Sequence, residues 1–489
     1  MTGIQLQKKW RRFTIRFVVN LKKLRKVKFT TVVLLGLTVR ILIAPFFAHP
    51  LDVFSWFTVG ENLVSGKQSL ESFLIPYDYA FFLFAFPGYL AFNLVTRYVP
   101  SGTFQMASLD PRLNPGIHFG ITVVPGLLFD LLVKLPLIVS DTLIAVILFK
   151  LVFRSTNDER LATFAAALWF LNPLSIWVSS GWGMFDTLPA LFTVLSIYFL
   201  LSKRFELSGL TLTSAIFLKY YAIVLAVPLL LMTWKTNGKN ATLRILLPSV
   251  ILSILLVLPL IRQDLSSLTG LIVGTPFESS SLHYAGLSLW TPFTLFIPHF
   301  NQGIISVIVL FPIIALIYLY EYKSYSGENF LTSTIMFSLP VSFLLIFYSF
   351  VAENFFIWLL PFASIIASID KPYRKHYWII SGIVLLSSVT DSLLPYYMLP
   401  DSQWIGGFLL GVLNLLSPYK VASGNGGINP GFSLGKIFLI CLSVASVLIT
   451  GIMTLRALKI ISSPQIVQTP LSAHQKRRIL GSDPDTLLT

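Results

Sequence analysis

Residues 131–153 read LLVKLPLIVSDTLIAVILFKLVF, an apolar run that decides the fold class. A helix of this length is long enough to cross the roughly 30 Å of hydrocarbon in a bilayer. Similar runs recur along the 489 residues, of which 55% are hydrophobic and only 12% are charged. A soluble domain has about 25% charged residues. The sequence therefore predicts an all-α polytopic membrane protein.

Apolar runs separated by charged or turn-rich segments predict about twelve transmembrane helices. These runs do not alternate as the strands of a membrane barrel would. The predicted spans lie near 29–47, 131–153, 161–178, 187–201, 207–218, 222–234, 245–261, 304–320, 330–350, 355–369, 378–397 and 434–458.

One further apolar stretch, 79–95, is interrupted by Pro87-Gly88. If it does not cross the membrane, most of the 36 Lys and Arg residues fall on one side, which the positive-inside rule identifies as cytoplasmic. We therefore expect it to be a membrane-surface helix, like the amphipathic segment 51–63. Both lie in a first external loop of about 49–130.

The remaining organisation follows from this orientation. We expect a basic cytoplasmic segment over 1–28, a transmembrane domain over 29–461 and a disordered cytoplasmic tail over 462–489. Further external segments are expected at about 262–290 and 398–432. The net charge of +15 reflects this asymmetry between loops, so no nucleic-acid partner is expected and membrane lipids are.

Two ionisable residues fall inside predicted spans at similar depths. Arg40 and Asp141 each lie about 10 Å below the outer boundary of the membrane, by the helical rise per residue. A structural ion pair between the first two spans is the favoured interpretation, and contact of Arg40 with a ligand phosphate is the alternative.

Asp52 stands at the head of the first external loop. A carboxylate at the start of a helix satisfies backbone N–H groups, so a capping role fits the residue. A carboxylate just outside the membrane also fits a general base. The spacing alone leaves both interpretations open.

Several stretches in this order resemble one membrane family. They are Asp52 after the first span, KLPLIVSDTLIAVIL (134–148), LNPLSIWVSSGWGMFDTLPALFTVLSIYFL (171–200), LKYYAIVLAVPLLL (218–231) and VAENFFIWLLP (351–361). Together they resemble the GT-C superfamily of polytopic glycosyltransferases, in the branch that uses polyprenyl- or dolichyl-phosphate-linked mannose or glucose. Ala352 stands where relatives often have His, and IPYDYAFF (75–82) replaces a Tyr-Pro-Pro sequence. These departures leave sugar and acceptor open.

The resemblance implies an inverting transfer of a hexose to a hydroxyl of a lipid-linked glycan or glycolipid at the extracytoplasmic face. Asp52 would be the general base, and Lys219, Arg262 and His283 would bind the donor phosphate. An alternative for Lys219 is a lysine that snorkels at a span end. The residues assigned to sugar or acceptor binding, with an aromatic interfacial belt as the alternative for the rings, are Trp182, Asp186, Tyr220, Tyr221, Tyr284, Glu353 and Asn354.

No set of residues with metal-ligand spacing is evident, so a metal-independent reaction without cofactor is expected, with a divalent cation left open. A flippase or transporter of lipid-linked sugars and an oligosaccharide ligase on a related scaffold are the alternative functions. The expected location is the plasma membrane of a prokaryote, or the endoplasmic reticulum membrane of a eukaryote, with both termini cytoplasmic.

Overall fold

The run 131–153 lies within the long helix α6 (Leu127–Thr156). Gly126 precedes this helix in an extended conformation, and Asn157 ends it in the left-handed conformation (φ 52°), with its N–H donating to the Phe153 carbonyl. Asn tolerates this conformation better than most residues. The computed structural model describes residues 27–48, 50–66, 79, 81–98, 106–108, 123–261, 286–297, 302–324, 330–349, 351–391 and 434–462.

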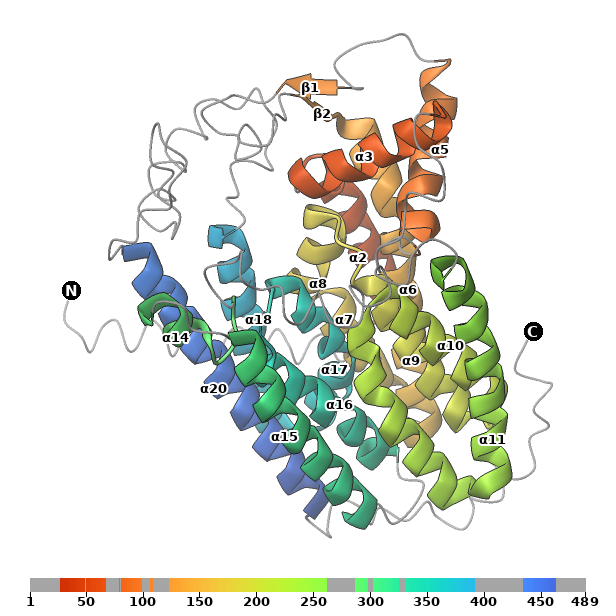
Figure 1. The fold of residues 1–489 in the computed structure, drawn as a ribbon, viewed down its shortest axis with the longest axis vertical. Helices are drawn as coiled ribbons and strands as arrows, with labels where there is room; N and C mark the ends of the chain where they lie inside the picture. Colours follow the sequence, from red (N-terminus) through yellow and green to blue (C-terminus); the bar gives the residue numbers. More distant parts are fainter. Residues whose placement is uncertain are drawn as a thin grey trace.

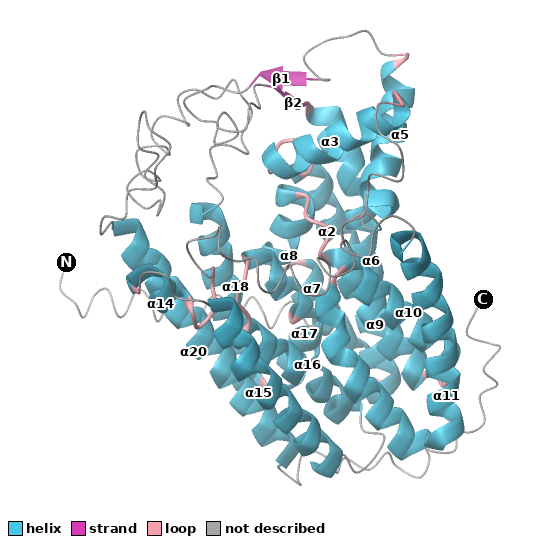
Figure 2. Cartoon of the chain, in the orientation of Figure 1, coloured by secondary structure: helices cyan, strands magenta, loops and turns pink. Residues whose placement is uncertain are grey.

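Helices make up nearly all of the described chain (Figure 2). The α-helices besides α6 are α2 (Phe29–Ile43), α3 (Pro50–Val64), α5 (Phe86–Thr96), α7 (Glu159–Phe170), α8 (Pro173–Ile176), α9 (Thr187–Leu201), α10 (Phe205–Leu218), α11 (Ala226–Ile261), α14 (Thr291–Phe296), α15 (Gln302–Ser324), α16 (Phe330–Phe347), α17 (Leu360–Ile369), α18 (Lys371–Asp391) and α20 (Leu434–Ser462). Two π-helical segments, η3 (Phe81–Ala85) and η5 (Trp177–Trp182), and two 3₁₀ segments, η6 (Tyr220–Leu225) and η9 (Glu353–Trp358), complete the helical elements.

The described chain is all-helical in class, as predicted, apart from one short two-stranded ribbon. Strands β1 (Met106–Ser108) and β2 (Val123–Pro125) pair antiparallel, with Ala107 opposite Val124. This short ribbon lies beyond α3 in Figure 1, at one end of the molecule. These residues pair because two extended segments between α5 and α6 satisfy each other's backbone groups.

Among the described residues, five helices are long and apolar enough to span a membrane, by length and composition. They are Leu127–Thr156, Tyr220–Leu258, Gly303–Ser324, Phe330–Phe347 and Ile437–Ser462. A bent pair, Glu159–Phe170 with Pro173–Trp182, would be a sixth if its two parts form one span. The chain is therefore an integral multi-pass membrane protein, although the structure does not establish the predicted twelve spans.

Several predicted spans are helices of fewer than 18 residues. Helices α9 and α10 have about the predicted length, whereas α2 and α17 are shorter than their apolar runs. The apolar helices of 10–17 residues are Phe29–Ile43, Phe81–Thr96, Thr187–Leu201, Phe205–Leu218 and Leu360–Ile369. Several give way to π or 3₁₀ turns whose backbone is buried among neighbouring helices. Buried protein surroundings make such irregular backbone tolerable at membrane depth.

Helix α11 contains a sharp break at Gly238, whose φ is 79°. Beyond the break, Arg244 pairs with Glu206 at the beginning of α10. Nearer the end of α11, the Leu256 carbonyl accepts a hydrogen bond from Tyr79, which lies close to η3. The two parts of α11 therefore run in opposite directions, in agreement with the two separate apolar runs predicted at 222–234 and 245–261.

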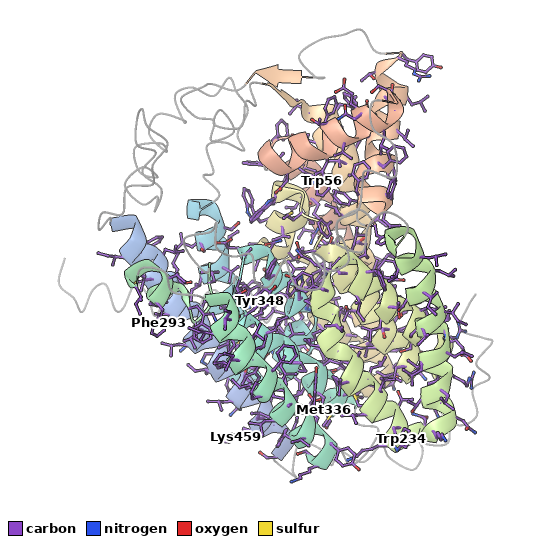
Figure 3. The ribbon with its side chains drawn as sticks, in the orientation of Figure 1. Trp56, Trp234, Phe293, Met336, Tyr348 and Lys459 are labelled. Carbon is purple, nitrogen blue, oxygen red and sulfur yellow. The ribbon has the colours of Figure 1, made fainter. Side chains whose placement is uncertain are left out.

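Helix α3 lies across one end of the helical bundle, which we call the α3 end (Figure 1). Its bounds agree with the amphipathic helix predicted at 51–63. Trp56 marks this end in Figure 3, whereas Trp234, Met336 and Lys459 lie toward the opposite end.

Besides a small cluster around Trp177 and Trp182, two apolar clusters hold the described helices together. The larger one fills the bundle between α6, α7, α9, α16 and α17. The smaller one joins α3, η3 and α5 to the beginning of α6 and to three side chains of the bundle, Phe185, Leu188 and Leu218. The α3 layer is therefore packed onto the bundle through buried aromatic contacts.

Several predicted regions lie outside the described residues. These are most of the basic segment 1–28, the external segment 262–285, the segment 398–432 and the tail 463–489.

Candidate functional site

Asp52 is the half-buried acidic residue in the first turn of α3. The indole N–H of Trp182, at the end of η5, donates a hydrogen bond to Asp52 Oδ2 at 2.9 Å. Trp182 itself is buried. The carboxylate that follows the first helix is thus held by the WGMFD motif, which lies 130 residues later.

Local sequence explains why Trp182 occupies this position. Asn172 caps α8 by accepting from the Leu174 N–H at 2.8 Å, and Pro173 takes the first helical position. The chain bends by 49° between α7 and the segment that continues through η5. Gly183 then ends η5 with φ 84°, a conformation that favours glycine. The resulting turn directs the indole toward α3.

A second carboxylate, Asp186, is buried four residues after Trp182. Lys219 Nζ lies 2.6 Å from Asp186 Oδ1, which also accepts from the Trp358 indole N–H at 2.7 Å. Asn354 donates its amide to Asp186 Oδ2 at 2.5 Å. Elements η9 and α10 therefore converge on the beginning of α9, and the charge of Asp186 is compensated by three donors.

Aromatic rings surround the Lys219 ammonium. It lies 4.6 Å from the ring centroid of Phe355, 5.0 Å from that of Phe185 and 5.3 Å from that of Trp358. Tyr221 stacks on Trp358 with centroids 3.7 Å apart. Such cation–π contacts favour a charged ammonium in a buried site.

Phe185 connects the Asp52 and Asp186 regions. Its ring lies edge-on to Trp56 of α3, 6.1 Å between centroids, and also faces the Lys219 ammonium. The structure therefore brings six residues of the predicted site into one continuous region at the α3 end, namely Asp52, Trp182, Asp186, Lys219, Tyr221 and Asn354.

The other predicted site residues fall into two groups. Glu353 is buried and accepts from the Ser387 hydroxyl at 2.7 Å, and the hydroxyls of Tyr220 and Tyr348 lie 2.6 Å apart. Three predicted residues lie outside the described part of the chain, namely Arg262, His283 and Tyr284.

Arg40 and Asp141 are brought together as an ion pair between α2 and α6. Arg40 Nε lies 2.8 Å from Asp141 Oδ2, and neither side chain is exposed. Arg40 also donates to the Phe170 carbonyl at 2.6 Å and to the Ser175 hydroxyl at 2.8 Å. These contacts fit a structural ion pair, because the guanidinium is held by protein groups on several sides.

Two residues of this region had no role assigned from sequence. Trp358, which donates to Asp186, lies in the VAENFFIWLLP stretch. The sequence did not reveal the 3₁₀ segment η9 that positions this indole. Lys134 is the first residue of the KLPLIVSDTLIAVIL stretch, and its ammonium is bonded to backbone carbonyls.

Within the described ranges, no three His, Cys, Asp or Glu side chains are grouped closely enough to hold a metal ion. Arg262 and His283 lie outside those ranges, so metal independence stays a prediction.

A model of the family described as GPI transamidase subunit PIG-U matches residues 119–273. The match contains Asp141, Trp182, Asp186 and Lys219 but neither Asp52 nor Glu353. No curated protein matches the chain. The resemblance to glycosyltransferases therefore stays a prediction. The chain is an integral multi-pass membrane protein whose residues 119–273 are similar to the GPI transamidase subunit PIG-U.

Proposed function

We propose that this protein is an inverting glycosyltransferase. It moves mannose or glucose from a polyprenyl- or dolichyl-phosphate donor to a hydroxyl of a lipid-linked glycan or glycolipid. The site is at the extracytoplasmic membrane face, which is the α3 end of the bundle in this proposal. A topology of about twelve passes, with both termini cytoplasmic, belongs to the same proposal.

One observation carries the proposal: a half-buried carboxylate, Asp52, is held by the Trp182 indole at 2.9 Å beside a buried polar cluster. As general base, Asp52 would take the proton of the acceptor hydroxyl while its oxygen attacks the anomeric carbon. The lipid phosphate leaves from the opposite face of the sugar, so the anomeric configuration inverts. The Trp182 bond supports this role because it orients the carboxylate.

Lys219 supports the departure of the phosphate in this mechanism. An ammonium has three N–H donors, and Asp186 holds Lys219 in place through one of them. The negative charge on the departing phosphate would be stabilised by Lys219, Arg262 and His283, all assigned by resemblance. The residues assigned to contact the sugar or acceptor are Trp182, Asp186, Tyr220, Tyr221, Tyr284, Glu353 and Asn354. No metal ion or other cofactor is required in this reaction scheme.

Purified protein in proteoliposomes tests the proposal. The assay follows radiolabelled mannose or glucose from its polyprenyl-phosphate donor to lipids extracted from the source organism. We expect Asp52→Asn to lower the transfer rate by about 10²–10⁴-fold, because the amide cannot accept the proton. The matched control is Glu61→Gln, which changes an exposed carboxylate on the same helix and should leave transfer unchanged. Equal rates for wild type and Asp52→Asn would reject Asp52 as the base.

The family match favours a second candidate, a non-catalytic subunit of a membrane complex like the GPI transamidase subunit PIG-U. The match spans Asp186 and Lys219 but not Asp52, so it accounts for the buried cluster without requiring a base. Purification from native membranes in mild detergent distinguishes the two. Stoichiometric membrane partners, combined with no transfer from either donor, would favour the complex subunit.

A further inference from the structure

Lys134 is completely buried in the second turn of α6, and within the described ranges its ammonium bonds backbone oxygens alone. The carbonyl of Ala44 accepts at 2.8 Å, that of Phe47 accepts at short range, and that of Gly181 lies at 3.4 Å. Two of these carbonyls follow α2, and the third belongs to η5. One side chain therefore joins three separate elements.

The chemistry of this contact suits a fixed anchor. An ammonium has three N–H donors, and three carbonyls occupy them, so little capacity remains for a ligand. Ala44 is the C-cap of α2, where the helix dipole favours a positive charge. These groups offset the cost of burying an ammonium.

The anchored segments are the ones that carry the proposed base and its partner. Phe47 precedes Asp52 by five residues, and Gly181 directly precedes Trp182. The Trp182–Asp52 hydrogen bond of 2.9 Å therefore joins two segments that are each tied to the same Lys134 ammonium.

Gly183 provides independent evidence that this packing is tight. A Cβ atom at Gly183 would lie 2.9 Å from Lys134 Cε, closer than real Cβ contacts. Its φ of 84° also disfavours any residue with a side chain. The turn after Trp182 and the Lys134 side chain thus fit each other without spare room.

We propose that Lys134 is a positioning residue that sets the distance between the Asp52 carboxylate and the Trp182 indole. It acts through the backbone at Phe47 and Gly181 and does not touch the substrate. As a statement about catalysis, this inference rests on the proposed function. As a statement about which segments are coupled, it stands on geometry alone.

Hydrogen–deuterium exchange of the purified full chain tests the coupling. In Lys134→Met, which keeps the apolar stem, we expect exchange in peptides covering 44–57 and 177–184 to become about tenfold faster, with other peptides unchanged. The matched control is Lys150→Met, an exposed lysine on the same helix, which should change neither peptide. Gly183→Ala strains the turn after Trp182 directly, so exchange should become faster in 177–184. A faster exchange that also reaches 44–57 would show that the two segments are coupled through Lys134.

The outcomes separate the coupling from the proposed function. Unchanged exchange in both segments, or a uniform increase throughout the chain, would overturn the anchor. If Lys134→Met fails to fold, the Gly183→Ala pattern decides. If the wild type transfers sugar, Lys134→Met should lower kcat by about ten- to a hundredfold and leave the donor KM within about twofold. If the wild type transfers nothing, the proposed function fails while the exchange result still tests the anchor.

Discussion

Two buried carboxylates in this protein have opposite surroundings. Asp186, toward the α3 end, accepts from Lys219, Asn354 and Trp358 within 2.5–2.7 Å. Glu321, on α15, is only 2% exposed, and neither of its oxygens has a hydrogen-bond partner among the described residues. The nearby Lys235 ammonium is instead bonded to the Tyr322 carbonyl and lies 4.3 Å from the Tyr322 ring centroid.

The difference separates burial from function. A buried carboxylate costs free energy unless donors compensate it. At Asp186 these donors come from α10 and η9, far apart in sequence, and they lie beside Asp52 and Trp182. At Glu321 the described residues provide none. A buried acidic residue in an apolar helix is therefore not enough to identify the candidate site. The site is identified by the organised set of hydrogen-bond donors around the carboxylate.

The largest change in stability is expected at Asp186. We expect Asp186→Asn to lower the free energy of unfolding by about 3–5 kcal/mol, because it leaves the Lys219 ammonium buried without its counter-charge. Denaturant unfolding in detergent measures this change. In the double variant Asp186→Asn with Lys219→Met, both charges are removed and most of the loss should be recovered. A single variant as stable as the wild type would show that the pair contributes little.

Glu321 should respond in the opposite direction. We expect Glu321→Gln to raise the free energy of unfolding by about 1–3 kcal/mol, because a neutral amide is cheaper to bury than an uncompensated carboxylate. The control is Glu206→Gln, whose exposed carboxylate pairs with Arg244 at 2.6 Å and which should lose a little stability or none. A marked loss in Glu321→Gln would mean that Glu321 has a partner beyond the described residues.

The smallest change in stability is expected at Asp370, and this change depends on pH. Partial burial by itself would raise its pKa. Hydrogen bonds from Arg456 and from the Tyr373 N–H, together with the charges of Arg456 and Arg374, outweigh burial and hold the pKa below its ordinary value. A lowered folded-state pKa contributes stability above the unfolded pKa of about 3.9, and that contribution disappears as the pH falls through the folded pKa.

The corresponding measurement compares wild type with Asp370→Asn at two pH values. The wild type should be more stable by less than about 1 kcal/mol near pH 7, since solvent screens this pair, and the difference should shrink below about pH 4. A difference that grows on acidification would have the wrong sign for a carboxylate with a lowered pKa.

Part of the fold could be predicted because it depends on local composition. The apolar runs predicted membrane helices, and five helices meet the length and hydropathy expected of spans. The amphipathic segment after the first helix became α3. The helical rise placed Arg40 and Asp141 at similar depths and so made an ion pair possible, and their side chains lie 2.8 Å apart in the structure. Helix lengths were less predictable, since π and 3₁₀ turns interrupt several runs.

The sequence by itself determined that the chain is a multi-pass membrane protein and that few ionisable residues are retained near its apolar segments. Only the tertiary structure decided their partners. Trp182 meets Asp52 across 130 residues, and Asn354 meets Asp186 across 168. Apolarity and periodicity report the surroundings of each helix, whereas hydrogen-bond partners depend on how bent helices pack side by side. That packing arises from contacts between distant segments, which no local pattern records.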